Sequence, residues 1–156
     1  MITNKIKYML SFLAGSLSLY LFYKPKNIQS AAGDKDKIYC RLFDNWLALN
    51  ERGDTVEQFF KRKNINEIAV YGCGNIGRHL MAQLSDSNIH IKYVIDKRKD
   101  SMTADHMPCY QLSDHMPAVD AIVVTPICEY SEIRNELKKV ISTEIISMED
   151  IIYELI

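Results

Sequence analysis

The sequence predicts an α/β fold in which a doubly wound parallel sheet follows two or three N-terminal helices. Short apolar runs, typical of buried strands, alternate with segments whose apolar residues recur at helical spacing. A glycine-rich turn joins the first of these runs to the next helical segment. The chain has 156 residues, 47% of them hydrophobic, which is enough for the core of one ordinary domain.

The first 37 residues are expected to form an apolar helix and a linker. Residues 8–23 carry no charge and have lysines on both sides. As a helix they would extend about 24 Å, which is less than the roughly 30 Å of a bilayer core. Four placements remain open: a helix lying on a membrane or a partner, a short membrane anchor, a helix packed on its own domain, and a cleaved signal. Residues 24–37 are polar and contain Pro and Gly, which indicates a linker.

Residues 38–64 are expected to form a helical lead-in of two helices. Gly53 suits the end of the first helix, and Asp54 is expected to cap the second, with Glu57 three residues later. The stripe on one face of the first helix is expected to cover the domain, with a dimer contact as the alternative. That stripe consists of Tyr39, Leu42, Phe43, Trp46, Leu49 and Asn50.

Residues 65–156 are expected to form the sheet domain. Because the strands alternate with helices, they should pair in parallel through right-handed crossovers. The expected strands are residues 67–72, 89–96, 119–126 and 144–147, and residues 109–114 are expected to form a further short strand or an extended segment.

Helical spacing in the same domain predicts three further helices, over residues 75–86, 129–141 and 148–155. Ser147 is expected to cap the last of them, with Asp150 at its third position. The buried face of the middle helix is expected to comprise Ile133, Leu137, Val140 and Ile141.

The stretch "VYGCGNIGRHL" (residues 70–80) has the glycine spacing of a phosphate-binding loop. Gly72 lets the strand turn sharply, Gly74 leaves room for an anionic group, and Gly77 lets helix and strand pack closely. Asn75 and Ile76 open the helix, whose exposed N–H groups and dipole favour negative charge. The loop therefore predicts nucleotide binding.

Three further positions are expected in the same crevice. Asp96 ends the next strand, where a carboxylate commonly accepts hydrogen bonds from a ribose diol. Lys97 follows it and begins a basic run that could meet a 2′-phosphate, so NAD and NADP both remain open. Thr125 and Pro126 end a later strand at the same sheet edge, where Thr125 would offer a hydroxyl and Pro126 would fix the turn.

Other chemistry is not favoured. The net charge of −1 argues against a broad nucleic-acid surface. The four cysteines match no zinc spacing, which indicates reduced thiols in a cytoplasmic protein, and no metal site is expected from the histidines. Tyr130 and Arg134 have the spacing of a catalytic Tyr-Lys pair, but arginine cannot play the part of the lysine.

The segment from Glu67 to Leu155 resembles the small Rossmann domain of bacterial surface-polysaccharide proteins, on the stretches "IAVYGCGNIGRHLMAQL", "YVIDK", "VDAIVVTP" and "IISMEDIIYEL". It is similar to the nucleotide-sugar epimerase/dehydratase type and to the N-terminal domain of sugar acyltransferases. The Thr-Pro ending is also similar to the NAD-binding domain of the glucose-fructose oxidoreductase group. The resemblance implies a dinucleotide or UDP-sugar over Gly72, Gly74, Ile76 and Gly77, with Asp96 at the sugar and Thr125 and Pro126 nearby.

The sequence departs from these families in its catalytic parts. It contains neither the hexapeptide repeats of the acyltransferases nor the catalytic-lysine domain of the oxidoreductases, and the Tyr-x-x-x-Lys pair of the epimerases is absent. We therefore expect a nucleotide-binding protein, for NAD(P) or a nucleotide sugar, in cell-surface polysaccharide synthesis. It would be a cytoplasmic homo-oligomer, peripheral or anchored at the inner membrane face, beside a glycosyltransferase or other glycan-synthesis enzyme. An oligomeric oxidoreductase or epimerase and a non-enzymatic NADH or CoA sensor remain alternatives.

Overall fold

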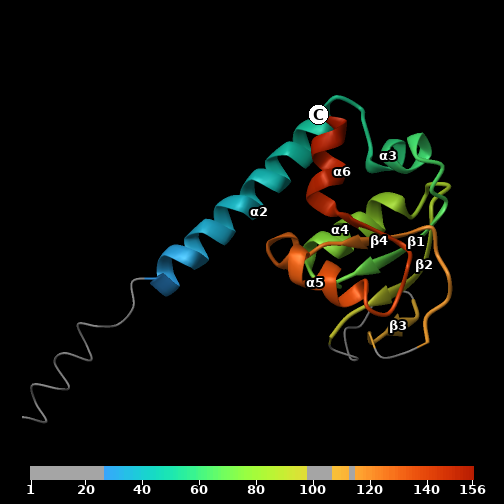
Figure 1. The fold of residues 1–156 in the computed structure, drawn as a ribbon. Helices are drawn as coiled ribbons and strands as arrows, with labels where there is room; N and C mark the ends of the chain where they lie inside the picture. Colours follow the sequence, from blue (N-terminus) through green and yellow to red (C-terminus); the bar gives the residue numbers. More distant parts are fainter. Residues whose placement is uncertain (1–26, 98–106, 113–114) are drawn as a thin grey trace, which may run out of the picture. The chain divides into compact units, whose positions relative to one another are not determined.

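The computed structural model describes residues 27–97, 107–112 and 115–156, and the chain divides into two compact units, residues 1–37 and 38–156. The second unit contains a five-stranded, all-parallel sheet in the order β3-β2-β1-β4-β5 (Figure 1). This confirms the α/β class and the parallel sheet, and the arrangement is compatible with a Rossmann-like fold. The strands are β1 (Glu67–Tyr71), β2 (His90–Ile95), β3 (Cys109–Tyr110), β4 (Ala121–Val124) and β5 (Glu144–Ser147).

The strand order reverses beside β1, which pairs with β2 on one side and with β4 on the other. All three strands run parallel, so their carboxyl ends meet at one edge of the sheet. In open α/β sheets such a reversal leaves a crevice at that edge, where ligands bind. The glycine turn after β1 and the Thr-Pro pair after β4 both lie there.

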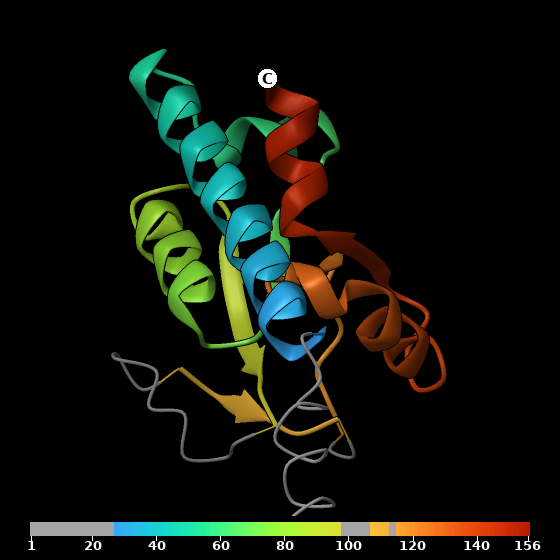
Figure 2. The ribbon, with the colours of Figure 1, turned by 90° about the vertical axis from the view of Figure 1, so that its left-hand side faces the viewer.

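Helices cover both faces of the sheet (Figures 1 and 2). One apolar core joins the sheet to α3, α4, α6 and the part of α2 from Ile38 onward, and a second core joins the opposite face to α5. The two helices α2 and α3 precede the sheet, as expected. The helices are α2 (Asn27–Glu51), α3 (Val56–Arg62), α4 (Asn75–Leu84), α5 (Tyr130–Leu137) and α6 (Met148–Leu155), and a 3-10 turn, η1 (Ile127–Glu129), precedes α5.

The part of α2 from Ile38 onward packs between α4 and α6 (Figure 2). Trp46 Nε1 donates a hydrogen bond of 2.8 Å to Gln83 Oε1 on α4, and Arg52 Nη2 donates one of 3.2 Å to the carbonyl oxygen of Leu155 on α6. Three members of the expected stripe are buried in the core, namely Leu42, Trp46 and Leu49. Two others, Phe43 and Asn50, are exposed.

The expected linker is wrong over residues 27–37, because α2 already begins at Asn27. The polar side chains that suggested a linker are compatible with a helix whose surface meets water. Lys37 and Asp34, for example, form an exposed ion pair of 3.7 Å across one helical turn. The prediction for residues 8–23 lies outside the described part of the chain. No helix in the described ranges is long and apolar enough to cross a membrane.

In the turn between α2 and α3, Gly53 ends α2 as predicted, but α3 is not capped by the predicted residue. Gly53 has φ +79°, its N–H donates to the carbonyl of Asn50, and the N–H of Asp54 donates to that of Leu49. This is the hydrogen-bond pattern of a Schellman motif. Asp54 therefore belongs to the end of α2, and the predicted cap is wrong: Thr55 holds the capping position of α3 without a side-chain hydrogen bond.

The start of α6 agrees with the sequence prediction, whereas the end of α5 does not. The Ser147 hydroxyl accepts the N–H of Glu149, so the expected cap of α6 is confirmed. Val140 was expected on the buried face of α5 but is 54% exposed. The reason is that α5 ends at Leu137, so the helical spacing does not continue to Val140.

Candidate functional site

Gly72 and Gly77 hold the turn between β1 and α4 by close backbone packing. Gly72 has φ +97°, and a Cβ there would lie 2.8 Å from Thr125 Oγ1. A Cβ on Gly77 would overlap the carbonyl oxygen of Gly72. Both positions therefore require glycine for the mechanical reasons that the sequence indicated. Gly77 is buried under the turn rather than facing a cavity.

Gly74 differs from the other two glycines of the motif. It occupies the capping position of α4 with an ordinary φ of −68°, and a Cβ there would meet no atom within 4 Å. The space in front of Gly74 is therefore open, at the end of a helix whose first N–H groups have no partner within the helix. The partial positive charge of such an end attracts anions.

Asp96 faces the glycine turn from the end of β2. Its side chain is 9% exposed, and its Oδ2 accepts a hydrogen bond of 2.9 Å from the N–H of Cys73. The carboxylate therefore braces the turn, a role that sequence reasoning missed because nothing local reveals a contact over 23 positions. Its role toward a ribose remains a prediction.

Thr125 is nearly fully buried behind the turn. Its hydroxyl donates to the carbonyl oxygens of Tyr71 and Gly72, at 3.0 and 3.1 Å. The hydroxyl proton is thus shared between these two carbonyls, while Thr125 still lines a cavity, so its role toward a ligand remains a prediction. The next residue, Pro126, lines the cavities on both sides of the turn.

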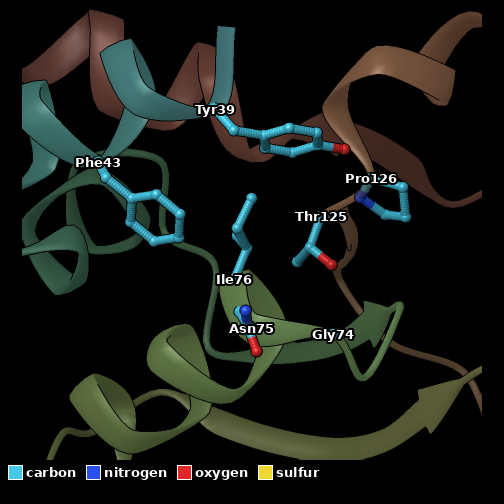
Figure 3. A pocket seen from close by; sticks show the side chains of 7 residues that line it. All are labelled: Tyr39, Phe43, Gly74, Asn75, Ile76, Thr125 and Pro126. Carbon is cyan, nitrogen blue, oxygen red and sulfur yellow. The ribbon is translucent and has the colours of Figure 1, made fainter. Parts of the chain in front are cut away.

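The first of these cavities, which we call the aromatic cavity, has a volume of about 380 Å³. Figure 3 shows Tyr39 and Phe43 of α2 on one side of it and Ile76 rising from α4. None of its lining side chains is charged, and its volume lies in the range of small-molecule sites. It is lined by Tyr39, Phe43, Gly74, Asn75, Ile76, Thr125 and Pro126.

The second cavity, which we call the acidic cavity, has a volume of about 240 Å³ and lies beside Asp96 and Lys97. Burial raises the pKa of the Tyr71 hydroxyl in its wall, and the negative charges of Glu136 and Asp96 raise it further. The negative charges of Glu136 and Asp96 therefore both act on this wall of the cavity. The cavity is lined by Tyr71, Gly72, Asp96, Lys97, Pro126, Glu129, Glu132, Ile133 and Glu136.

The structure thus brings eight of the nine expected positions to two adjoining cavities and leaves Gly77 beneath the turn. Sequence reasoning missed the walls supplied by α2 and α5. Tyr39 and Phe43 carry the same apolar spacing as the core residues of α2, so no local signal separates them. Glu129, Glu132 and Glu136 have the one-turn spacing of a solvated helix face.

Tyr39 is held in place at the rim of the aromatic cavity. Burial, together with nearby Cys128 and Glu129, raises its pKa to about 12, and its side chain is hydrogen-bonded to that of Cys128. The phenol therefore stays neutral at physiological pH. It offers an aromatic surface rather than an acid or base.

Metal-ligating side chains, Tyr130 and the cysteines are the other candidates for chemistry raised by the sequence. No three His, Cys, Asp or Glu side chains are placed to hold a metal ion within residues 27–97, 107–112 and 115–156. Tyr130 donates its hydroxyl proton to the carbonyl of Ile145 at 2.9 Å, so it serves the packing of α5 against β5. None of the four cysteines, all of which lie in the described ranges, forms a disulfide. The arrangement offers an open start of α4 with a cavity on either side of the glycine turn.

Comparison with known proteins adds no assignment. A scan against models of protein families found no match to this chain, and a search of curated proteins found none that is significantly similar.

Proposed function

We propose that this protein binds a nucleotide, NAD(P) or a nucleotide sugar, at the glycine turn between β1 and α4. The carrying observation is the contrast within the motif: Gly72 and Gly77 leave no room for a Cβ, whereas Gly74 opens into space at the start of α4. A turn that served packing alone would not need a glycine at the open position, where φ is ordinary. The open position has the place and polarity of a phosphate subsite.

The surroundings support a nucleotide rather than a free phosphate. The aromatic and acidic cavities share Pro126 in their linings. The groups attached to either side of a bound phosphate could therefore each occupy one cavity. Asp96, which braces the turn, also lines the acidic cavity, where a carboxylate suits a ribose diol. The glycine turn also lies where the strand order reverses beside β1, which is the usual ligand position in open α/β sheets and supports the proposal.

The proposed biological setting is bacterial cell-surface polysaccharide synthesis, with a separate catalytic partner. Its support is the sequence resemblance described above. Tyr130 donates its hydroxyl proton to the carbonyl of Ile145. A glycosyltransferase or another enzyme of glycan synthesis would then carry out the reaction.

The binding site is tested with Gly74→Asp. The variant should fold, because Asp caps helices well and its Cβ meets no atom within 4 Å. The new carboxylate would occupy the anion position, so we expect the ligand response to be lost. The measurement is a thermal-shift panel with NAD(H), NADP(H) and UDP-sugars, in which a ligand at 100 times its dissociation constant stabilises by about 2.7 kcal/mol.

Two control variants separate the causes. Gly74→Asn has nearly the same size and capping ability without the charge, so a smaller loss than with Asp shows the electrostatic part. Gly33→Asp places the same carboxylate in α2, where a Cβ also meets no atom within 4 Å, and should respond to ligand as the wild type does. Absence of any nucleotide response in the wild type, or an undiminished one in Gly74→Asp, would refute the proposal.

A further inference from the structure

We infer that the two cavities select NAD(H), a dinucleotide with an unphosphorylated ribose, over NADP(H) and nucleotide sugars. This inference rests on the proposed nucleotide site. It narrows the ligand by the chemistry of the walls on either side of the glycine turn. The acidic cavity disfavours a ribose phosphate, and the aromatic cavity disfavours a hexose.

The acidic cavity brings carboxylates from three elements to the position expected for a ribose. Asp96 enters from the end of β2, while three glutamates enter from η1 and α5: Glu129, Glu132 and Glu136. Lys97 is the single cation among the described residues that line this cavity. A 2′- or 3′-phosphate placed here would bring up to two negative charges among four carboxylates, whereas a ribose diol would donate hydrogen bonds to them.

This charge effect should be local. Glu132 and Glu136 are exposed, so salt screens their fields over about 8–10 Å. A phosphate inside the acidic cavity would feel them strongly, and a diphosphate at the start of α4 would feel them less. The cavity can therefore discriminate against a ribose phosphate without preventing the binding of the diphosphate.

The aromatic cavity has few polar groups to offer a sugar. Tyr39 is engaged with Cys128 and Thr125 with two backbone carbonyls, and Oδ1 of Asn75 accepts a hydrogen bond from Arg78. A hexose has several hydroxyls, and burying it here would cost more hydrogen bonds to water than these few groups could replace. The flat ring of a nicotinamide would instead stack against Tyr39 or Phe43.

The test is titration calorimetry of the full chain with NAD+, NADP+ and UDP-glucose at about 0.1 M ionic strength, where screening acts over about 10 Å. We expect NAD+ to bind about tenfold or more tightly than NADP+, because several like charges act on the added phosphate. The NADP+/NAD+ ratio of dissociation constants should shrink as NaCl is raised, since screening weakens the repulsion. UDP-glucose should bind more weakly than NAD+.

The variant Glu132→Gln/Glu136→Gln should reduce the same ratio about threefold or more. Its matched control is Asp44→Asn/Glu51→Gln, which removes two exposed charges of α2 that line neither cavity and should leave the ratio unchanged. If NADP+ or UDP-glucose binds as tightly as NAD+ and Gly74→Asp abolishes the binding, the selectivity is wrong while nucleotide binding stands. If no probe binds, both the selectivity and the proposed function are wrong.

Discussion

Thr125 shows how a single side chain sets the shape of the glycine turn. Its hydroxyl reaches the carbonyls of Tyr71 and Gly72, and its backbone N–H donates to the same Tyr71 carbonyl at 3.0 Å. The end of β4 is thereby joined to the turn that follows β1. The contact depends on glycine at position 72, because a Cβ there would lie only 2.8 Å from Thr125 Oγ1.

Replacing Thr125 separates this role from packing. Thr125→Val keeps the shape but removes the donor, and we expect it to lower the free energy of unfolding by about 1–3 kcal/mol, because a buried carbonyl loses a hydrogen-bond partner. Thr125→Ser keeps the hydroxyl and should be the milder change. Urea denaturation measures both. A Val variant as stable as the Ser variant would show that the hydroxyl does not hold the turn.

At the scale of elements, α2 is part of the sheet domain from Ile38 onward. It contributes Leu42, Trp46 and Leu49 to the core and two aromatic side chains to a cavity wall. A helix with such a buried face cannot be removed without exposing apolar surface. The lead-in therefore stabilises the fold and shapes the candidate site.

Two leucines on this helix provide a matched comparison. Leu49 is fully buried, so Leu49→Ala should lower the free energy of unfolding by about 2–5 kcal/mol through lost burial and a new cavity. Leu47 is 58% exposed, and Leu47→Ala should change it by no more than about 0.5 kcal/mol. Thermal or urea unfolding checks both. Equal effects of the two substitutions would contradict the placement of this helix.

At the scale of the whole molecule, hydrogen-bonded carboxylates connect distant segments. Asp120 Oδ2, just before β4, accepts hydrogen bonds from the backbone N–H groups of Asn66 and Glu67 at the start of β1, both at 2.9 Å. These hydrogen bonds lower the pKa of Asp120. Glu57 joins α3 to Asn88, and its hydrogen bonds with Lys61 and with the Asn88 N–H lower its pKa too.

Because folding lowers the pKa values of Asp120 and Glu57, the protein should lose stability in acid. A carboxyl whose pKa is lowered by folding stabilises the protein above its ordinary pKa, near pH 4, and this stability is lost as the pH falls further. We expect the melting temperature to fall below about pH 4. The fall should be shallower in Asp120→Asn, while Asp44→Asn, an exposed change on α2, should follow the wild type. An Asp120→Asn profile identical to the wild-type profile would contradict this linkage.

Much of the fold could be predicted because its signals are local. The apolar runs of β1 and β4, the glycine spacing and the Ser147 cap each depend on neighbouring residues, and the structure has them as expected. The errors also have local causes. Asp54 resembles a cap but completes the end of α2, and Val140 continues a helical spacing after α5 has stopped.

The sequence by itself determined the parallel α/β arrangement and the glycine turn, because strand and helix periods and glycine's missing Cβ act over a few residues. Only the tertiary structure decided that Asp96 braces that turn, that Tyr39 and Phe43 form one cavity wall, and that three glutamates of η1 and α5 form another. These residues come from segments far apart in the chain. Their meeting depends on how helices pack on a twisted sheet, which no short pattern records.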